Sequence, residues 1–123
     1  MADLCVFCEI VAGREPATQV AAGTDAIAIR PLNPVVTGHL LVLPVKHVRD
    51  AAEDPHVSAE VMRLAAVLAP MFCPGAFNII TSAGREATQS VFHLHLHIVP
   101  RRADDGLALP WYSGKRSKAA RRG

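Results

Sequence analysis

The chain has 123 residues and half of them are hydrophobic, which predicts a single folded domain over residues 1–123 and excludes a disordered chain. The apolar stretch from Leu64 to Phe72 is interrupted by Pro70 and is too short to span a bilayer, so we expect no membrane partner. The N-terminus lacks the charged start and long apolar run of a signal peptide, and the odd number of cysteines favours a reducing compartment. These features predict a soluble, cytoplasmic protein.

The net charge of +2 is a property of the C-terminal tail. The last ten residues hold five basic side chains and no acidic one; without them, eight basic residues stand against 11 acidic ones, a net charge of −3. We therefore expect residues 103–123 to be a loosely structured basic segment, whose ordinary role is that of a solubilising, frayed terminus. A nucleic-acid partner is not expected, except for a weak, salt-sensitive contact through this tail.

A C-x-x-C pair opens the fold at Cys5-Val6-Phe7-Cys8. Two thiolates at this spacing form either half of a metal site or a redox dithiol. The redox motif expects a strand before it, and only the segment Met1–Leu4 precedes Cys5. We therefore favour the metal site. A short helix should follow, with Gly13 as its stop.

The next segments predict strands and one long helix. Turn residues separate the strands Gln19–Ala22 and Ala26–Arg30, and the apolar run Leu40–Leu43 suits a strand buried on both faces. Asp54-Pro55 is a helix start, with Asp as N-cap and Pro at the first position. The helix should lay one face on a sheet and end or kink at Pro70; its apolar positions at helical spacing are Val57, Val61, Leu64, Ala65 and Leu68.

Three histidines alternate with apolar residues in Val91–Val99, which follows a predicted strand at Ala76–Thr81 and a flexible loop at Ser82–Thr88. Strict alternation predicts a half-buried strand, with the histidines on one face and the apolar residues Phe92, Leu94, Leu96 and Ile98 directed into the core. Strands that cluster around one long helix, with a short N-terminal helix, predict an α+β fold with an antiparallel sheet.

A row of imidazoles offers groups that accept protons, attack electrophiles or bind metals near neutral pH. Alternate residues of a strand are about 6.6 Å apart, so His93 and His97 would be about 13 Å apart at their backbones and could hardly share one ion. The row must therefore divide its roles. Cys5 and Cys8 with two histidines would complete a tetrahedral Cys2His2 zinc site, in which His47 is the natural third ligand and His93 the fourth.

His93-Leu94-His95-Leu96-His97-Ile98-Val99 resembles the motif of the nucleotide-binding histidine-triad (HIT) proteins, H-x-H-x-H followed by two hydrophobic positions. Other segments between Cys5 and about Arg102 match the same family: Cys5–Ile10 with Pro16, Asn33-Pro34, Gly38–Pro44, Lys46-His47, Phe77-Asn78 and Gln89-Ser90. The C-x-x-C pair is similar to that of the zinc-containing bacterial branch. The resemblance implies a HIT-like fold, usually paired as a homodimer. It also implies hydrolysis at the α-phosphate of a nucleotide substrate, such as a phosphoramidate of a purine nucleoside monophosphate.

By this resemblance, His95 would attack phosphorus and form a nucleotidyl-histidine intermediate that water then cleaves. An imidazole can do this at neutral pH without an activating base. His97 and His39 would bind the phosphate oxygens, and Ser90 and Gln89 would donate to the phosphate and the leaving group. Further matches to substrate-binding positions of the family are Asn78, Phe7, Ile10, Leu32 and Asn33. The zinc held by Cys5, Cys8, His47 and His93 would be structural.

Three positions depart from the family pattern. Pro31 stands where many members have an Asp that holds the ribose, Ser82 where an Asn is usual, and Thr88 where a Gly is usual. These departures leave nucleotide affinity and base preference open. The alternatives are a dinucleoside polyphosphate hydrolase and a non-catalytic nucleotide-binding or scaffold protein of the same fold. A metallohydrolase is disfavoured because no acidic residue accompanies the histidine row. By the same resemblance, Trp111 and the tail could contact a partner subunit's site; the alternative is that Trp111 is an aromatic residue that caps the surface.

Overall fold

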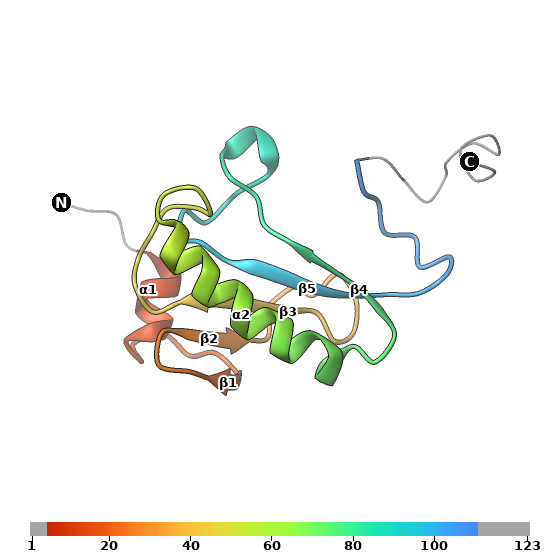
Figure 1. The fold of residues 1–123 in the computed structure, drawn as a ribbon, viewed down its shortest axis with the longest axis horizontal. Coiled ribbons are helices and arrows are strands. Elements are labelled where there is room, and N and C mark those ends of the chain that lie inside the picture. Colours follow the sequence, from red (N-terminus) through yellow and green to blue (C-terminus); the bar gives the residue numbers. More distant parts are fainter. Residues whose placement is uncertain (1–4, 111–123) are drawn as a thin grey trace.

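The computed structural model describes residues 5–110 and has an α+β fold, as predicted from the sequence. The tail from Trp111 onward, for which a role at a partner's site was considered, lies outside these residues. The sheet has five strands in the order β1-β2-β3-β5-β4, and every neighbouring pair is antiparallel. The helices and strands are α1 (Val6–Val11), β1 (Gln19–Ala22), β2 (Ala26–Ile29), β3 (Leu40–Pro44), α2 (Pro55–Phe72), β4 (Ala76–Ile80), the 3-10 helix η1 (Arg85–Ala87) and β5 (Leu96–Arg101). Figure 1 shows their arrangement.

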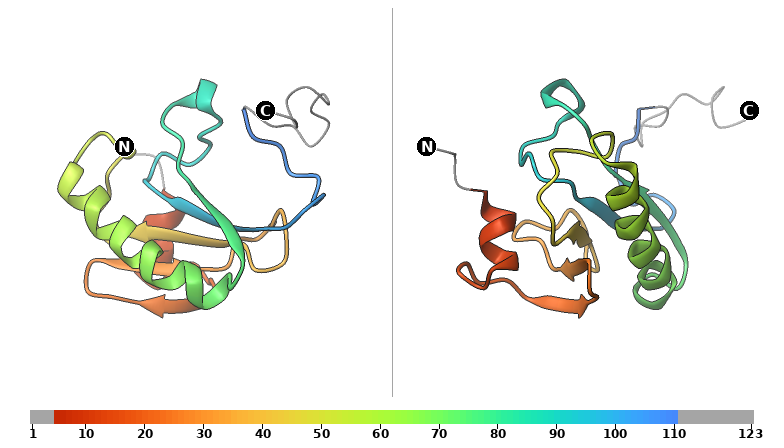
Figure 2. Two further views of the ribbon diagram at one scale, coloured as in Figure 1. Left: turned by 45° about the vertical axis from the view of Figure 1, so that its right-hand side comes forward. Right: turned by 60° about the vertical axis from the view of Figure 1, so that its left-hand side comes forward.

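The two α-helices lie on opposite faces of the sheet, as the right-hand view of Figure 2 shows. α2 packs against one face of β2, β3 and β5, where it buries residues such as Val61, Ala65 and Leu68 with Val42 and Ile98. α1 covers a smaller part of the other face: its Phe7 and Ile10 pack against a cluster formed by Ile27, Ile29, Leu41 and Leu43 of β2 and β3. β3 is buried along its whole length between the two layers, as the continuous apolar run predicted.

Asp54 begins α2, as the Asp-Pro pair predicted. Its side chain accepts hydrogen bonds from the backbone N–H groups of His56 and Val57, which the first helical turn leaves without intrahelical partners. Of the two outcomes expected at Pro70, an end or a kink, the end is wrong, because α2 continues to Phe72. Pro70 is three residues before the C-cap Cys73, where the helix is already close to its end. Among residues 5–110, no helix is long and apolar enough to cross a membrane.

The predicted strand over Val91–Val99 is wrong in its first half, because β5 begins only at Leu96. The backbone before that point pairs elsewhere: the Leu94 N–H donates to the Val48 carbonyl, beyond the end of β3. Phe92 was expected in the core but is 41% exposed, since no ladder holds its side chain toward the sheet. The alternation of apolar and polar residues therefore begins before the strand does and does not mark the residue at which the strand starts.

Candidate functional site

The site lies on the half of the sheet face that α1 leaves uncovered. In the antiparallel register, His97 of β5 stands opposite Leu41 of β3 and Ile80 of β4, and directly opposed residues share a face. Leu41 packs in the α1 cluster, so His97 faces the same side as α1. Val99 and Arg101 follow on that face by the two-residue period of a strand. The short N-terminal helix thus leaves room beside it for the histidines.

His39 and His97 form a hydrogen-bonded pair. Nε2 of His39 is 2.9 Å from Nδ1 of His97, and Nδ1 of His39 accepts from the backbone N–H of Val35 at 3.2 Å. Because Nδ1 of His39 is an acceptor, its proton is on Nε2 and is donated to His97. Nδ1 of His97 is therefore an acceptor as well, and Nε2 of His97 carries a hydrogen that can bind a phosphate oxygen.

His95 is oriented by a main-chain carbonyl. Its Nδ1 is 2.8 Å from the carbonyl oxygen of His93, which can only accept, so the hydrogen is on Nδ1 of His95. Nε2 then keeps a free lone pair. The ring lies 5.1 Å from that of His97 and makes an edge contact with Phe7 at 5.0 Å. This arrangement leaves a nucleophilic nitrogen beside a hydrogen-bond donor.

Burial keeps these imidazoles neutral at physiological pH. It lowers the pKa of His39 and of His95, and it is the first cause that lowers the pKa of His97 to about 4. The neighbouring His95 and His39 also lower the pKa of His97, because a second positive charge beside them is unfavourable. A neutral His95 is the form that can attack.

Cys5, Cys8, His47 and His93 form a cluster that could hold a metal ion, and their ligand atoms all lie within 4.8 Å of one another. Nδ1 of His93 is 3.1 Å from Nδ1 of His47, 3.4 Å from Sγ of Cys5 and 3.5 Å from Sγ of Cys8, and Sγ of Cys8 is 3.2 Å from Nδ1 of His47. A tetrahedron with metal–nitrogen and metal–sulfur bonds of about 2.0 and 2.3 Å has edges of about 3.3–3.8 Å. The donor set therefore fits one tetrahedral ion.

Two supporting contacts orient these ligands. Nε2 of His93 donates to the Pro44 carbonyl at 2.9 Å, which leaves Nδ1 with the lone pair that a metal requires. Sγ of Cys5 accepts from the backbone N–H of Cys8 at 3.4 Å, as the N-cap of α1. The structure brings together the four residues that the spacing argument named, although only Cys8 lies in a helix and the other three lie outside any helix or strand.

Gln89 and Ser90 occupy different environments. Gln89 is 5% exposed, and its amide bonds only to backbone: Oε1 accepts from the N–H of Gly84, and Nε2 donates to the carbonyls of Arg49 and Val91 at 2.7 and 3.1 Å. Gln89 thus ties the loop around η1 to the segment after β3. Ser90, next in the chain, is exposed and can meet a ligand.

The other predicted substrate-binding residues are only partly brought together. Phe7 and Ile10 are buried in the α1 cluster, and Phe7 makes edge contacts with the rings of His93 and His95. Leu32 is 95% exposed, and Asn33 beside it is exposed as well. Oδ1 of Asn78 accepts a hydrogen bond of 2.6 Å from Arg101, so this side chain supports β5.

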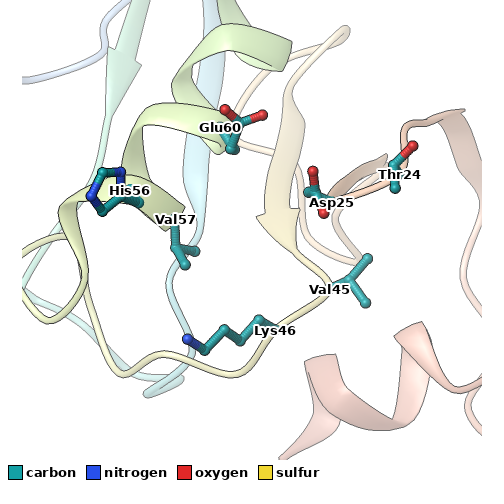
Figure 3. A pocket seen from close by; sticks show the side chains of 7 residues that line it. All are labelled: Thr24, Asp25, Val45, Lys46, His56, Val57 and Glu60. Carbon is teal, nitrogen blue, oxygen red and sulfur yellow. The ribbon is translucent and has the colours of Figure 1, made fainter.

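A pocket of about 330 Å³ adjoins the histidine pair. It lies between β5, the loop around η1 and the C-terminal arm, residues 102–110, which turns back beside the sheet in Figure 2. His39 and His97 line it, together with apolar residues of the sheet and the arm. A second hollow of about 380 Å³ lies between the β1–β2 turn and the start of α2, and Figure 3 shows Lys46, His56 and Glu60 around it. It contains none of the predicted site residues.

Sequence reasoning missed the ion pair that fixes the arm. Arg101 binds both carboxylate oxygens of Asp105, at 2.8 and 3.1 Å, and the carbonyl of Leu107 at 3.0 Å. The Asp105 carboxylate also accepts from the backbone N–H groups of Arg102 and Leu107. These donors, with Arg101 first, hold the pKa of Asp105 well below its usual range. The only sequence signal was the turn-forming Asp104-Asp105-Gly106.

Comparison with known proteins agrees with this geometry: the HIT domain matches residues 12–104. The chain belongs to the HIT domain family. A HIT-like protein of Mycobacterium tuberculosis strain H37Rv is 36% identical over 110 residues, which cover 85% of this chain and 76% of that protein. The adenosine 5'-monophosphoramidase hnt1 of Schizosaccharomyces pombe is 32% identical over 111 residues, 89% of this chain and 84% of that one. The crystal structure of SMU.412c from Streptococcus mutans UA159 matches this HIT protein with a TM-score of 0.82 and 32% identity, covering 100% of this chain and 81% of that chain.

Proposed function

We propose that this HIT protein hydrolyses nucleoside phosphoramidates or related nucleotides at the α-phosphate through a nucleotidyl-His95 intermediate. The observation that supports this most is the hydrogen bond from His95 to the His93 carbonyl, which directs the free lone pair of Nε2 away from the backbone. The similarity to a relative named adenosine 5'-monophosphoramidase points to the same substrate class.

The proposed reaction has two displacements. Nε2 of His95 forms a bond to phosphorus while the bond from phosphorus to the leaving nitrogen breaks, and that nitrogen takes up one proton from solvent and departs as an amine. Water then attacks phosphorus and the bond to Nε2 breaks, which releases the nucleoside monophosphate and returns the proton to solvent. His97, held by His39, donates from Nε2 to a phosphate oxygen, and the exposed Ser90 hydroxyl is a second donor.

Phe7 and Ile10 would form the wall behind the nucleoside, with Leu32 and Asn33 at its rim. Asn78 acts through Arg101 rather than on the substrate, and Gln89 acts through the loop that carries Ser90. The purine base is a proposal that follows from the family resemblance.

We further propose that the Cys2His2 cluster holds a structural zinc ion, as in the zinc-containing bacterial branch of the family. Zinc prefers tetrahedral sites of thiolate and imidazole ligands, and the distances among Cys5, Cys8, His47 and His93 suit that geometry. Bound zinc would tie α1 to the segments that carry His47 and His93.

We also expect a homodimer, which equilibrium sedimentation should find, and a cytoplasmic location, which cell fractionation should find. A monomer would contradict the first expectation, and a membrane-associated pool would contradict the second.

The proposed reaction is tested by incubating the protein with adenosine 5'-phosphoramidate and trapping the adduct. Wild-type protein should accumulate an acid-labile adenylyl group on His95, and His95→Ala should release no adenosine monophosphate. A matched control is His56→Ala, which removes an exposed imidazole at the start of α2. Turnover that survives in His95→Ala would refute the assignment of the nucleophile.

A further inference from the structure

We propose that the pocket beside His97 binds the leaving group of the substrate, and that this group is uncharged and largely apolar. The proposal rests on the proposed function, because it assumes that phosphorus is attacked at His95. It adds a chemical class for the part of the substrate that departs.

The position of the pocket follows from the order of the rings. Phe7 contacts His95 from the side of α1, whereas the pocket is lined by His97 and His39 on the side of β4. His95 and His97 lie side by side, with ring centres 5.1 Å apart. A phosphorus atom at His95 therefore has α1 on one side and the pocket on the other. If the nucleoside packs against the α1 side, the remaining substituent of the phosphate extends into the pocket.

The lining of this pocket is mostly aliphatic. Val99 and Ile80 come from the sheet, Val35 from the segment before β3, and Leu107 and Leu109 from the C-terminal arm. Besides Arg101 and the two neutral imidazoles, the polar side chains of its lining are the hydroxyls of Ser82 and Thr88. A volume of about 330 Å³ is at the small end of ligand pockets and equals the share of about eleven water molecules, so a compact alkyl or aryl group would fill it.

The charges argue against an anionic leaving group. Arg101 is the one lysine or arginine among the described lining residues, and its guanidinium is already bound to Asp105, Asn78 and the Leu107 carbonyl. The side chain of Asp105 is 4% exposed, so this pair is shielded from solvent. A nucleoside polyphosphate leaving group would bring several negative charges to a site with no further cation among these residues, which disfavours a dinucleoside polyphosphate as substrate.

An ion pair and backbone hydrogen bonds fix the conformation of the C-terminal arm. Arg101 and Asp105 form a two-point ion pair, and the carboxylate also accepts two backbone N–H groups across the turn. Gly106 has a φ of +76°, which an L side chain rarely adopts, and this turn brings Leu107 back to Arg101. The apolar wall is therefore held rigidly and can select among leaving groups.

Three adenosine phosphoramidates test the proposal: those of methylamine, pentylamine and 5-aminopentanoate. The leaving nitrogen is a primary alkyl amine in each, so the three differ mainly in the body that would enter the pocket. We expect the pentylamide to bind about tenfold more tightly than the methylamide, because its extra methylene groups are buried, and the carboxylate-bearing compound to bind more weakly than the pentylamide. Titration calorimetry with His95→Ala measures these dissociation constants without turnover, and wild-type kcat/KM should follow the same order.

A charge placed in the wall should reverse the preference. In Leu109→Lys, the 5-aminopentanoate compound should bind at least as tightly as the pentylamide, while Ala103→Lys, on an exposed turn of the arm that does not line the pocket, should keep the wild-type order. Turnover with equal affinity for all three compounds would refute the leaving-group pocket and leave the proposed function standing. The expected order of affinities without any turnover would support the pocket and refute the proposed function.

Discussion

Replacing Gln89 by methionine should destabilise the protein by about 2–4 kcal/mol. The side chain is almost fully buried, and methionine keeps its length while removing three hydrogen bonds to backbone. Each such bond contributes about 1 kcal/mol net, and the N–H of Gly84 would in addition be left without its acceptor. The bonds join residues up to 40 positions apart, so their loss also releases the loop that presents Ser90.

Urea unfolding of the full chain measures this loss, with Gln19→Met as the matched control. Gln19 is exposed on the edge strand β1, and its replacement should change the free energy of unfolding by less than about 0.5 kcal/mol. Because the loop carries Ser90, kcat/KM for a phosphoramidate should fall more steeply in Gln89→Met than the loss of folded protein explains. A Gln89→Met protein as stable as the control would show that water or another group replaces the amide, and that this side chain does not position the loop.

Four further predictions follow from the site and its surroundings. Cys8→Ser should lose about one zinc ion per chain, measured by atomic absorption, and should unfold at a lower urea concentration. Wild-type protein treated with a chelator should behave in the same way. Full metal content in the variant would contradict the Cys2His2 assignment. The pKa of His97 is lowered to about 4, so between about pH 6.5 and 4 the unfolded chain binds a proton that the folded chain does not bind. The stability contributed by His97 should therefore be constant above about pH 6.5 and fall between about pH 6.5 and 4, and the fall should be smaller in His97→Asn. The pKa of Asp105 is lowered as well, here because its charged form is stabilised. This contribution to stability is full above the unfolded pKa of about 4 and is lost in acid, so Asp105→Asn should be less stable at pH 7 and should lose less on acidification. Thr88 has a φ of +74°, unfavourable for a β-branched residue, so Thr88→Gly should raise the thermal midpoint through a gain of up to about 1 kcal/mol; a lower midpoint would mean that its side-chain contacts outweigh the strain.

Local patterns in the sequence predicted most of the fold. The Asp54-Pro55 pair gave the start of α2 and the apolar run Leu40–Leu43 gave the doubly covered β3, because capping and burial are properties of short segments. Two predicted boundaries were wrong: the end of α2 at Pro70 and the start of the histidine strand at Val91. Pro70 lacks the N–H that would bond to the Ala66 carbonyl, but its φ is compatible with a helix and α2 continues to Phe72. Alternation does not reveal where the partner strand stops. The alternating sequence identified the three histidines as candidate site residues, but their different hydrogen-bond partners are visible only in the folded chain.

Long-range hydrogen bonds limited the prediction of the site. Gln89 was expected to face the substrate, but its partners at Gly84, Arg49 and Val91 are visible only in the folded chain. The same holds for Arg101 and Asp105, whose pairing holds the wall of a pocket in a segment that was expected to be loosely structured. The Cys2His2 cluster was easier, because metal ligation restricts residue types as well as positions.

His93 contacts the cysteine pair with its side chain and His95 with its main chain. Its ring faces the cysteines, whereas its carbonyl oxygen fixes the tautomer of His95. A side-chain replacement at position 93 removes the first contact and leaves the atom that makes the second in the chain. The proton on the proposed nucleophile therefore does not depend on the side chain at position 93 but does depend on the position of the main chain, and an ion bound by the ring would restrain that main chain. If the cluster holds an ion, its removal would therefore lower activity even though all the residues proposed to act on the substrate are still present.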